Sequence, residues 1–127
     1  MDEQILIVDD NATNLKLLRV LLSKEGYKIR TAESAEDAMA VLKESRPHLI
    51  LMDIQLPGMD GLDLTRQLKA DPDTRDIIVL AVTSYAMKTD QEKALAAGCN
   101  GYVTKPIDTR ALPDLVRRYL DGGANPP

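Results

Sequence analysis

The sequence contains no phenylalanine or tryptophan, and four tyrosines are its only large aromatic side chains. The chain therefore lacks the ring cluster on which nucleic-acid bases or a flavin would stack. Its single cysteine, Cys99, has no partner for an internal disulfide. No apolar run approaches the roughly 18 residues of a membrane span, and the N-terminus shows no basic-then-apolar signal. These absences predict a cytoplasmic protein with an aliphatic core.

Positive charge is not in excess either. The chain has 16 Lys and Arg residues against 20 Asp and Glu, for a net charge of −4 and a pI of about 4.9. We therefore expect neither nucleic acid nor a membrane as a partner. With 127 residues, 44% of them apolar, the chain fits one domain, and any output module is expected on another chain. The domain should cover residues 1–121, and the turn-rich residues 122–127 should form a flexible tail.

Short apolar runs alternate with segments of helical periodicity. Apolar runs without polar alternation are typical of strands buried on both faces of a parallel sheet. Such runs occupy residues 5–8, 49–52, 77–82 and, more weakly, 102–104, and a short strand with charged ends at residues 28–31 is expected at a sheet edge. Helices are expected at residues 14–24, 35–42, 61–70, 86–97 and 112–119. Ser34, with Asp37 three residues later, resembles a capping box and marks the start of the second helix. Five alternating strands and helices predict a doubly wound α/β fold with a parallel sheet.

Polar residues follow several of the predicted strands, at the edge where ligands bind in this fold class. These residues are Asp9, Asp10, Asp53, Thr83 and Lys105. Three crowded carboxylates repel one another unless a cation neutralises them. Oxygen ligands with room for water and phosphate favour Mg²⁺, and Mn²⁺ is expected to substitute for it. Adjacent acids also suit a helix start, so helix capping remains an alternative for Asp9 and Asp10.

Four motifs give the chain a family resemblance. They are ILIVDDN at residues 5–11, LILMDIQLPGMDGLDL at 49–64, AVTSYA at 81–86 and GYVTKPID at 101–108. From about residue 4 to residue 120, the chain resembles the receiver domains of two-component response regulators. Its details are most similar to stand-alone receivers of the DivK type or to receivers of hybrid kinases. The resemblance implies a flavodoxin-like (βα)5 fold with strand order 2-1-3-4-5.

The resemblance also implies a role for each acid. Asp53 would be the phosphoacceptor, which attacks a phosphohistidine of a histidine kinase or phosphotransfer protein and becomes an aspartyl phosphate. Asp10 and Asp53 would bind Mg²⁺ directly, Asp9 would act largely through water, and Gln55 would contribute its backbone carbonyl. Lys105 would pair with the phosphoryl oxygens. These parts match what phosphoryl transfer needs, namely an in-line nucleophile and positive charge on the phosphoryl oxygens.

Further residues would form the switch and set the lifetime of the aspartyl phosphate. By resemblance, Thr83 would hydrogen-bond the phosphoryl group and leave space for Tyr102 to turn from exposed to buried. The Lys105-Pro106 bond is a candidate cis peptide that would aim the lysine. The positions that tune hydrolysis would be those of Gln55, Ser84 and Tyr85. The bulk of Tyr85 predicts slow autodephosphorylation.

The implied partners are proteins. The first helix, with Leu15 near Asp53, would dock on the helical bundle of the histidine kinase or phosphotransfer protein. The fourth helix, fifth strand and fifth helix would bind a downstream target, and the protein would be a monomer or a weak dimer. The chain would not be an enzyme beyond catalysing its own phosphorylation and dephosphorylation. Elsewhere, His48 and Cys99 are interpreted as structural residues, and residues 117–118 as a solvated helix face.

Four alternatives remain at this point. The chain could be a receiver excised from a hybrid kinase, or a binding-only pseudo-receiver that is never phosphorylated. A metal-dependent phosphohydrolase with an aspartyl nucleophile would need a second acid two residues after Asp53, where the sequence has Gln55. A flavodoxin-like cofactor carrier would have its flavin phosphate repelled by Asp9 and Asp10.

Overall fold

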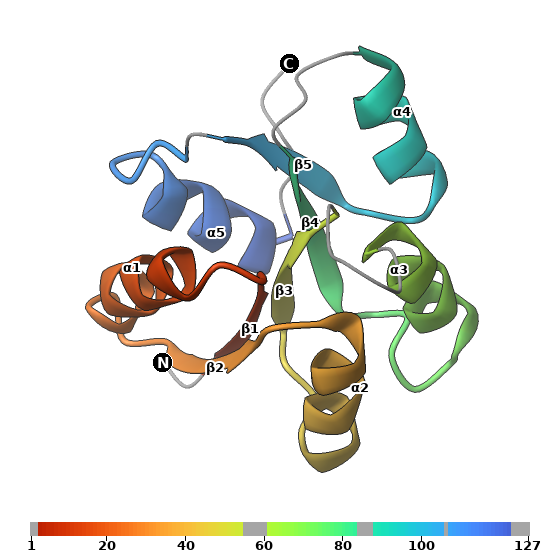
Figure 1. Cartoon of the computed structure of the whole chain (residues 1–127), viewed down its shortest axis with the longest axis horizontal. Coiled ribbons are helices and arrows are strands. Elements are labelled where there is room, and N and C mark those ends of the chain that lie inside the picture. The colour runs from red at the N-terminus through yellow and green to blue at the C-terminus, as the bar shows by residue number, and fades with distance from the viewer. Residues whose placement is uncertain (1–2, 55–60, 84–87, 106, 123–127) are drawn as a thin grey trace.

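The computed structural model describes residues 3–54, 61–83, 88–105 and 107–122. Five parallel strands form one sheet in the order β2-β1-β3-β4-β5 (Figure 1). The strands are β1 (Gln4–Val8), β2 (Lys28–Ala32), β3 (Leu49–Asp53), β4 (Ile78–Thr83) and β5 (Gly101–Thr104). The predicted doubly wound sheet and its strand order are confirmed, and β2 lies at an edge as its charged ends predict.

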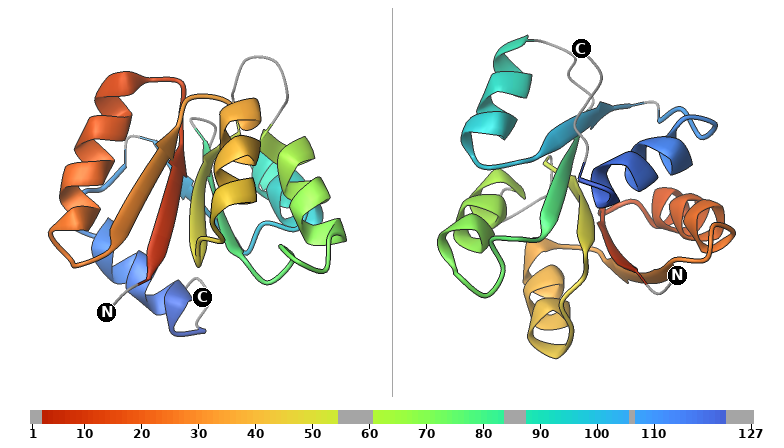
Figure 2. Two further views of the ribbon diagram at one scale, coloured as in Figure 1. Left: turned by 90° about the horizontal axis from the view of Figure 1, so that it is seen from below. Right: turned by 180° about the vertical axis from the view of Figure 1, so that it is seen from behind.

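Helices cover both faces of the sheet. They are α1 (Ala12–Ser23), α2 (Ala35–Glu44), α3 (Gly61–Ala70), α4 (Lys88–Ala96) and α5 (Leu112–Leu120). Buried residues of α1 and α5 belong to one apolar cluster, and those of α2, α3 and α4 belong to the other. Figure 1 shows the same division, and in the left view of Figure 2 the strands stand side by side between the helices. No helix among the described residues is both long and apolar enough to cross a bilayer.

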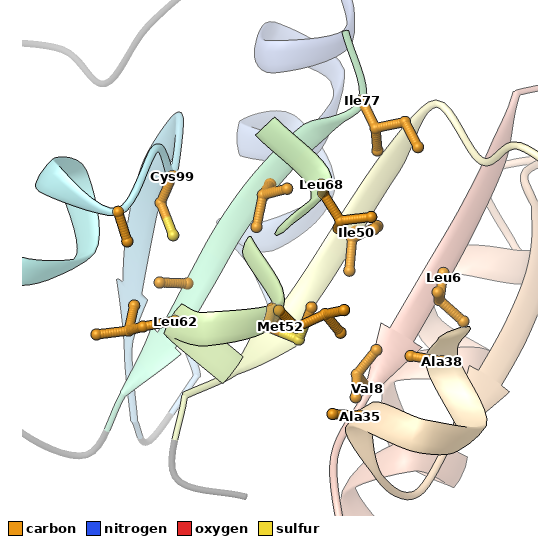
Figure 3. Close-up of a cluster of buried hydrophobic side chains, with 14 of the residues drawn as sticks. Leu6, Val8, Ala35, Ala38, Ile50, Met52, Leu62, Leu68, Ile77 and Cys99 are labelled. Carbon is orange, nitrogen blue, oxygen red and sulfur yellow. The ribbon is translucent and has the colours of Figure 1, made fainter. Parts of the chain in front are cut away.

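The central strands carry the core. Every residue of β3 is buried, which is the burial expected of a strand covered on both faces. Side chains of β1 and β3 alternate between the two clusters because successive side chains point to opposite faces. Figure 3 shows one cluster, in which Leu6 and Val8 of β1 lie near Ala35 and Ala38 of α2.

Strand register brings the carboxyl ends of neighbouring strands to one edge, here called the carboxyl edge. In the β1–β3 ladder Val8 pairs with Met52, and in the β3–β4 ladder Asp53 pairs with Val82. β4 begins one residue later than its apolar run, because the backbone N–H of Ile77 donates to Thr74 in the preceding turn. At the carboxyl edge, Asp53 is the last residue of β3 and Thr83 is the last residue of β4.

Side chains that accept free backbone N–H groups set where α1 and α2 begin. The Ser34 hydroxyl accepts the backbone N–H of Asp37, which confirms the predicted cap of α2. α1 begins at Ala12 because the Asn11 side chain accepts the N–H of Asn14. α5 has no side-chain cap. Its first turn contains a proline, whose missing N–H would have had no partner within the helix.

Candidate functional site

Three carboxylates meet at the carboxyl edge. Asp53 ends β3, and Asp9 and Asp10 directly follow β1. One oxygen from each of the three side chains lies within 4.8 Å of the others. Asp9 and Asp53 are buried, whereas Asp10 is exposed, so the cluster has a closed side and a side open to solvent. The three acids that the sequence placed at this edge are thus brought together.

Lys105 provides the cation of the site. Its Nζ atom lies 3.1 Å from Asp53 Oδ2 and 3.8 Å from Asp9 Oδ2. The backbone N–H of Lys105 donates to the carbonyl of Thr83 at 2.8 Å, so the lysine is attached to the end of β4. One ammonium faces three carboxylates, and the cluster therefore keeps an excess of negative charge.

Asp9 is held by the start of α1. Its Oδ1 accepts the backbone N–H of Asn11 at 2.8 Å, and its Oδ2 is 3.4 Å from the Asn14 amide nitrogen, which donates to it. Burial raises the pKa of the Asp9 carboxyl, the Asn11 N–H and the Lys105 ammonium lower it, and the Asp53 charge raises it further. The orienting role of these two asparagines was not predicted. The Asp-x-Asn spacing is the local signal that could have indicated it.

The donor set suits a hard divalent cation. Among the described residues, this is the one group of three or more possible ligands close enough to hold a metal ion. All three ligands are carboxylate oxygens, two of them buried, and carboxylates without enough neutralising charge favour binding of a cation. Such oxygens are the ligands that Mg²⁺ prefers, whereas Zn²⁺ sites usually include sulfur or nitrogen. The residues present therefore fit Mg²⁺.

Thr83 and Tyr102 lie on neighbouring strands. Thr83 is buried at the end of β4, and it pairs in register with Thr104 of β5. Tyr102 is half-buried on β5, where it packs against the cluster formed with α2, α3 and α4. Other residues that the sequence analysis assigned to the site, Gln55, Ser84, Tyr85 and Pro106, lie outside the described residues.

Leu15 does not form part of an accessible face. Only 7% of this residue is exposed, because its side chain packs between α1 and the sheet. The exposed large apolar residues of α1 are Leu17 and Val20, at 51% and 49%. Leu15 therefore packs α1 against the sheet, and α1 exposes Leu17 and Val20, while docking of a partner on this helix stays a prediction.

Structural interpretations elsewhere are mostly confirmed. Cys99 is buried, and His48 Nδ1 accepts the backbone N–H of Gln4 at 3.0 Å. Arg118 is solvent-exposed as expected. Arg117 is only partly exposed, because its guanidinium lies 2.8 Å from the Glu3 carboxylate and 2.9 Å from that of Asp121, the residue that follows α5.

The chain is similar to known proteins in sequence and in fold. The sequence profile described as "response regulator receiver domain" matches residues 5–117. The polar-differentiation response regulator DivK of Brucella anthropi is 42% identical over 120 residues, which are 94% of this chain and 98% of that protein. A CheY-like receiver domain protein from Methanospirillum hungatei is 30% identical, with a TM-score of 0.88 over 96% of each chain. The receiver domain of a histidine kinase from Syntrophus aciditrophicus is 34% identical, with a TM-score of 0.87 over 98% of this chain and 95% of that one. With this profile match, these relatives and this fold, the chain belongs to the response regulator receiver domains of two-component signalling systems.

Proposed function

We propose that the protein is a single-domain response regulator that accepts a phosphoryl group on Asp53 from the phosphohistidine of a histidine kinase or phosphotransfer protein. The observation that carries this proposal is the environment of Asp53. Its carboxylate ends a fully buried strand, lies 3.1 Å from the Lys105 ammonium and shares an edge with two further carboxylates. Burial and mutual repulsion both disfavour an acid beside two others at this edge, so three acids placed there indicate a chemical role.

The chemistry assigns a task to each side chain. A carboxylate oxygen of Asp53 attacks the phosphorus, the P–N bond to histidine breaks, and the leaving imidazole keeps the electron pair. Lys105 neutralises charge on the phosphoryl oxygens, and the buried hydroxyl of Thr83 donates to one of them. Asp10 and Asp53 would hold Mg²⁺ directly and Asp9 largely through water, and the ion would supply further positive charge. In dephosphorylation, a water oxygen attacks the phosphorus, the P–O bond to Asp53 breaks, and inorganic phosphate leaves while Asp53 recovers its carboxylate. The domain thus catalyses its own phosphorylation and dephosphorylation.

The output is a change in protein contacts. Thr83 and Tyr102 are the switch pair: β4, which ends at Thr83, lies beside the strand of Asp53, and β5, which carries Tyr102, lies on the other side of β4. Tyr102 also lines a groove of about 260 Å³ between β5 and α5, with Thr104, Leu112 and Leu115. Leu95 of α4 is exposed. This face of α4, β5 and α5 is the proposed docking site for a downstream target.

The phosphoryl donor approaches from the other side of the site. Leu17 and Val20 on α1 form an exposed apolar pair, which fits the helical bundle of a histidine kinase or phosphotransfer protein. α1 begins two residues after Asp10, so a partner seated on this helix lies close to the carboxyl edge. Both faces belong to a domain that acts in the cytoplasm as a monomer or weak dimer.

Intact-mass spectrometry after incubation with Mg²⁺ and acetyl phosphate tests the phosphoacceptor. The wild type should gain the mass of one phosphoryl group, and Asp53→Asn, which keeps the shape of the side chain, should gain none. Omitting Mg²⁺ should abolish the gain. If the wild type gains nothing from acetyl phosphate or from phosphohistidine donors while folded and able to bind Mg²⁺, the binding-only alternative replaces this proposal. A mass gain in both the wild type and Asp53→Asn would show that the phosphoacceptor is a residue other than Asp53.

A further inference from the structure

Gly61, the first residue of α3, packs directly on the backbone of the phosphoacceptor. A Cβ atom added at Gly61 would lie 2.6 Å from the carbonyl oxygen of Asp53 and 3.0 Å from the Cα atom of Ile54. It would also lie 3.1 Å from Cγ of Met52. Figure 3 shows the Met52 side chain of β3 near the start of α3, where Leu62 is labelled. Only the absence of a side chain allows this approach.

The backbone at this junction cannot move aside easily. Asp53 pairs with Val82 in the β3–β4 ladder, and the N–H of Ile54 donates to the Val82 carbonyl at 3.1 Å. Pairing with β4 therefore fixes one side of the backbone around Asp53, and Gly61 in the first turn of α3 contacts the same backbone. Two of the three atoms that a Cβ would meet are backbone atoms, so a side chain here must displace either α3 or Asp53.

A buried hydroxyl fixes the first turn of α3. Thr65 is fully buried, and its Oγ1 donates to the carbonyl of Gly61 at 2.9 Å. The same oxygen accepts a weak hydrogen bond from the Cys99 thiol, with the sulfur 3.9 Å away. The hydroxyl thus has both a donor and an acceptor role in an otherwise apolar cluster, where polar groups need partners. Thr65 thereby ties the Gly61 peptide to the first turn of α3 and, through Cys99, to the segment before β5.

We propose that Gly61 and Thr65 are positioning residues for phosphoryl transfer: their close contact sets where the Asp53 carboxylate stands relative to Lys105 and to the other two acids. The inference rests on the proposed role of Asp53 as phosphoacceptor. In-line attack and metal ligation both depend on the placement of this one side chain. A displacement of about 1 Å is enough to cost on the order of 100-fold in rate.

The variant Gly61→Ala adds the missing Cβ, and Gly98→Ala is its matched control. Gly98 lies in the turn after α4 with a φ of +107°, and a Cβ there would meet the Lys69 side chain at 2.7 Å. Both variants should therefore unfold at lower urea concentration than the wild type. At a temperature where each is folded, Gly61→Ala should lose about tenfold or more in the rate of phosphorylation by acetyl phosphate. Its Kd for Mg²⁺, followed by amide NMR shifts, should rise by about tenfold, whereas Gly98→Ala should match the wild type in both.

If Gly61→Ala does not fold, a pair of variants at Thr65 tests the inference instead. Thr65→Val removes the hydroxyl at nearly constant shape, and Thr65→Ser keeps it. The valine variant should lose Mg²⁺ affinity and shift the amide resonances of Asp53 and Ile54 in the metal-free protein, and the serine variant should restore both. Equal behaviour of the two variants would overturn the inference, as would wild-type Mg²⁺ affinity in folded Gly61→Ala. A wild type that binds Mg²⁺ but takes up no phosphoryl group would overturn the proposed function instead, while the Mg²⁺ titrations would still decide the role of Gly61.

Discussion

The substitution Lys105→Met tests how the carboxyl edge is held together without metal. Methionine has a similar length and no charge, so the variant removes the ammonium that lies 3.1 Å from Asp53 Oδ2 and 3.8 Å from Asp9 Oδ2. The side chains of both acids are almost completely buried, at 3% and 4% exposure, while that of Lys105 is 23% exposed. The variant leaves two buried carboxylates next to each other with no cation between them.

The expected loss of stability is a few kcal/mol. At an effective dielectric constant of about 20, the two contacts correspond to roughly 5 and 4 kcal/mol of Coulomb attraction. Much of that is offset, because three charged groups lose hydration in the folded state. Breaking a buried ion pair by removing one partner typically costs about 3–5 kcal/mol. Since Lys105 keeps some contact with solvent, we expect the free energy of unfolding at pH 7 to fall by about 3 kcal/mol in the absence of metal.

Acid and Mg²⁺ should both reduce this loss. Lys105 lowers the pKa of Asp9 in the folded protein, while burial raises it. Removing the lysine raises that pKa further above its value in the unfolded chain. A raised carboxyl pKa destabilises the fold above that pKa, and the penalty disappears as the pH falls and the group is protonated. Mg²⁺ at ten times its Kd adds about 1.4 kcal/mol to the stability of any folded form that binds it. The variant should bind Mg²⁺ more tightly, because no ammonium competes for the carboxylates.

Urea unfolding at pH 7 in EDTA, at pH 7 with Mg²⁺ and at about pH 3 provides the measurement. Lys28→Met is the matched control, because it removes the same charge from an exposed side chain at the amino end of β2. The control should differ from the wild type by less than about 0.5 kcal/mol under all three conditions. The reasoning is refuted if the stability of Lys105→Met is within that range at pH 7 without metal, or if its deficit is the same at low pH.

Three further predictions concern stability and reactivity away from the acids. Leu22→Ala removes a fully buried side chain of α1 and should lower the free energy of unfolding by about 2–5 kcal/mol in urea titrations. Arg117→Met should destabilise the fold at neutral pH, and Arg118→Met should not. Because the hydrogen bond from Arg117 lowers the pKa of Glu3, this difference should shrink as the pH falls below about 4.5, and a difference independent of pH would contradict it. Burial raises the pKa of the Cys99 thiol, so Ellman's reagent should react with it only after unfolding, and rapid reaction of the native protein would show that the site is open.

Much of the fold is predictable because it depends on local patterns. Apolar runs without alternation predicted four strands within one or two residues, since a strand covered on both faces can contain few polar side chains. Ser34 predicted the start of α2, because its hydroxyl satisfies a backbone N–H that the helix leaves free. α3 begins and ends at the predicted residues, Gly61 and Ala70.

Long-range contacts between polar groups were not predictable in the same way. Arg117 was interpreted as solvated, yet its partner Glu3 stands 114 residues earlier in the chain, and no local pattern connects the two. Leu15 and Leu17 are both apolar residues of α1, but the exact rotation of the helix decides that the first is buried and the second exposed. The contact between Gly61 and Asp53 also depends on how a helix start seats on a strand end.

The carboxyl edge contains charges that weaken the fold, and the rest of the molecule compensates for them. Burial raises the pKa of the Asp9 carboxyl, and repulsion from the nearby Asp53 charge raises it further. The apolar layers around β1, β3 and β4 supply the stability that offsets the crowding of these acids. If Asp53 is phosphorylated as proposed, the added negative charge makes the imbalance larger, and the edge would then draw in cations and hydrogen-bond donors. Lys105 is already in contact, and Thr83 stands at the end of the next strand. A site that is short of positive charge at rest is therefore suited to change its contacts when a phosphoryl group arrives.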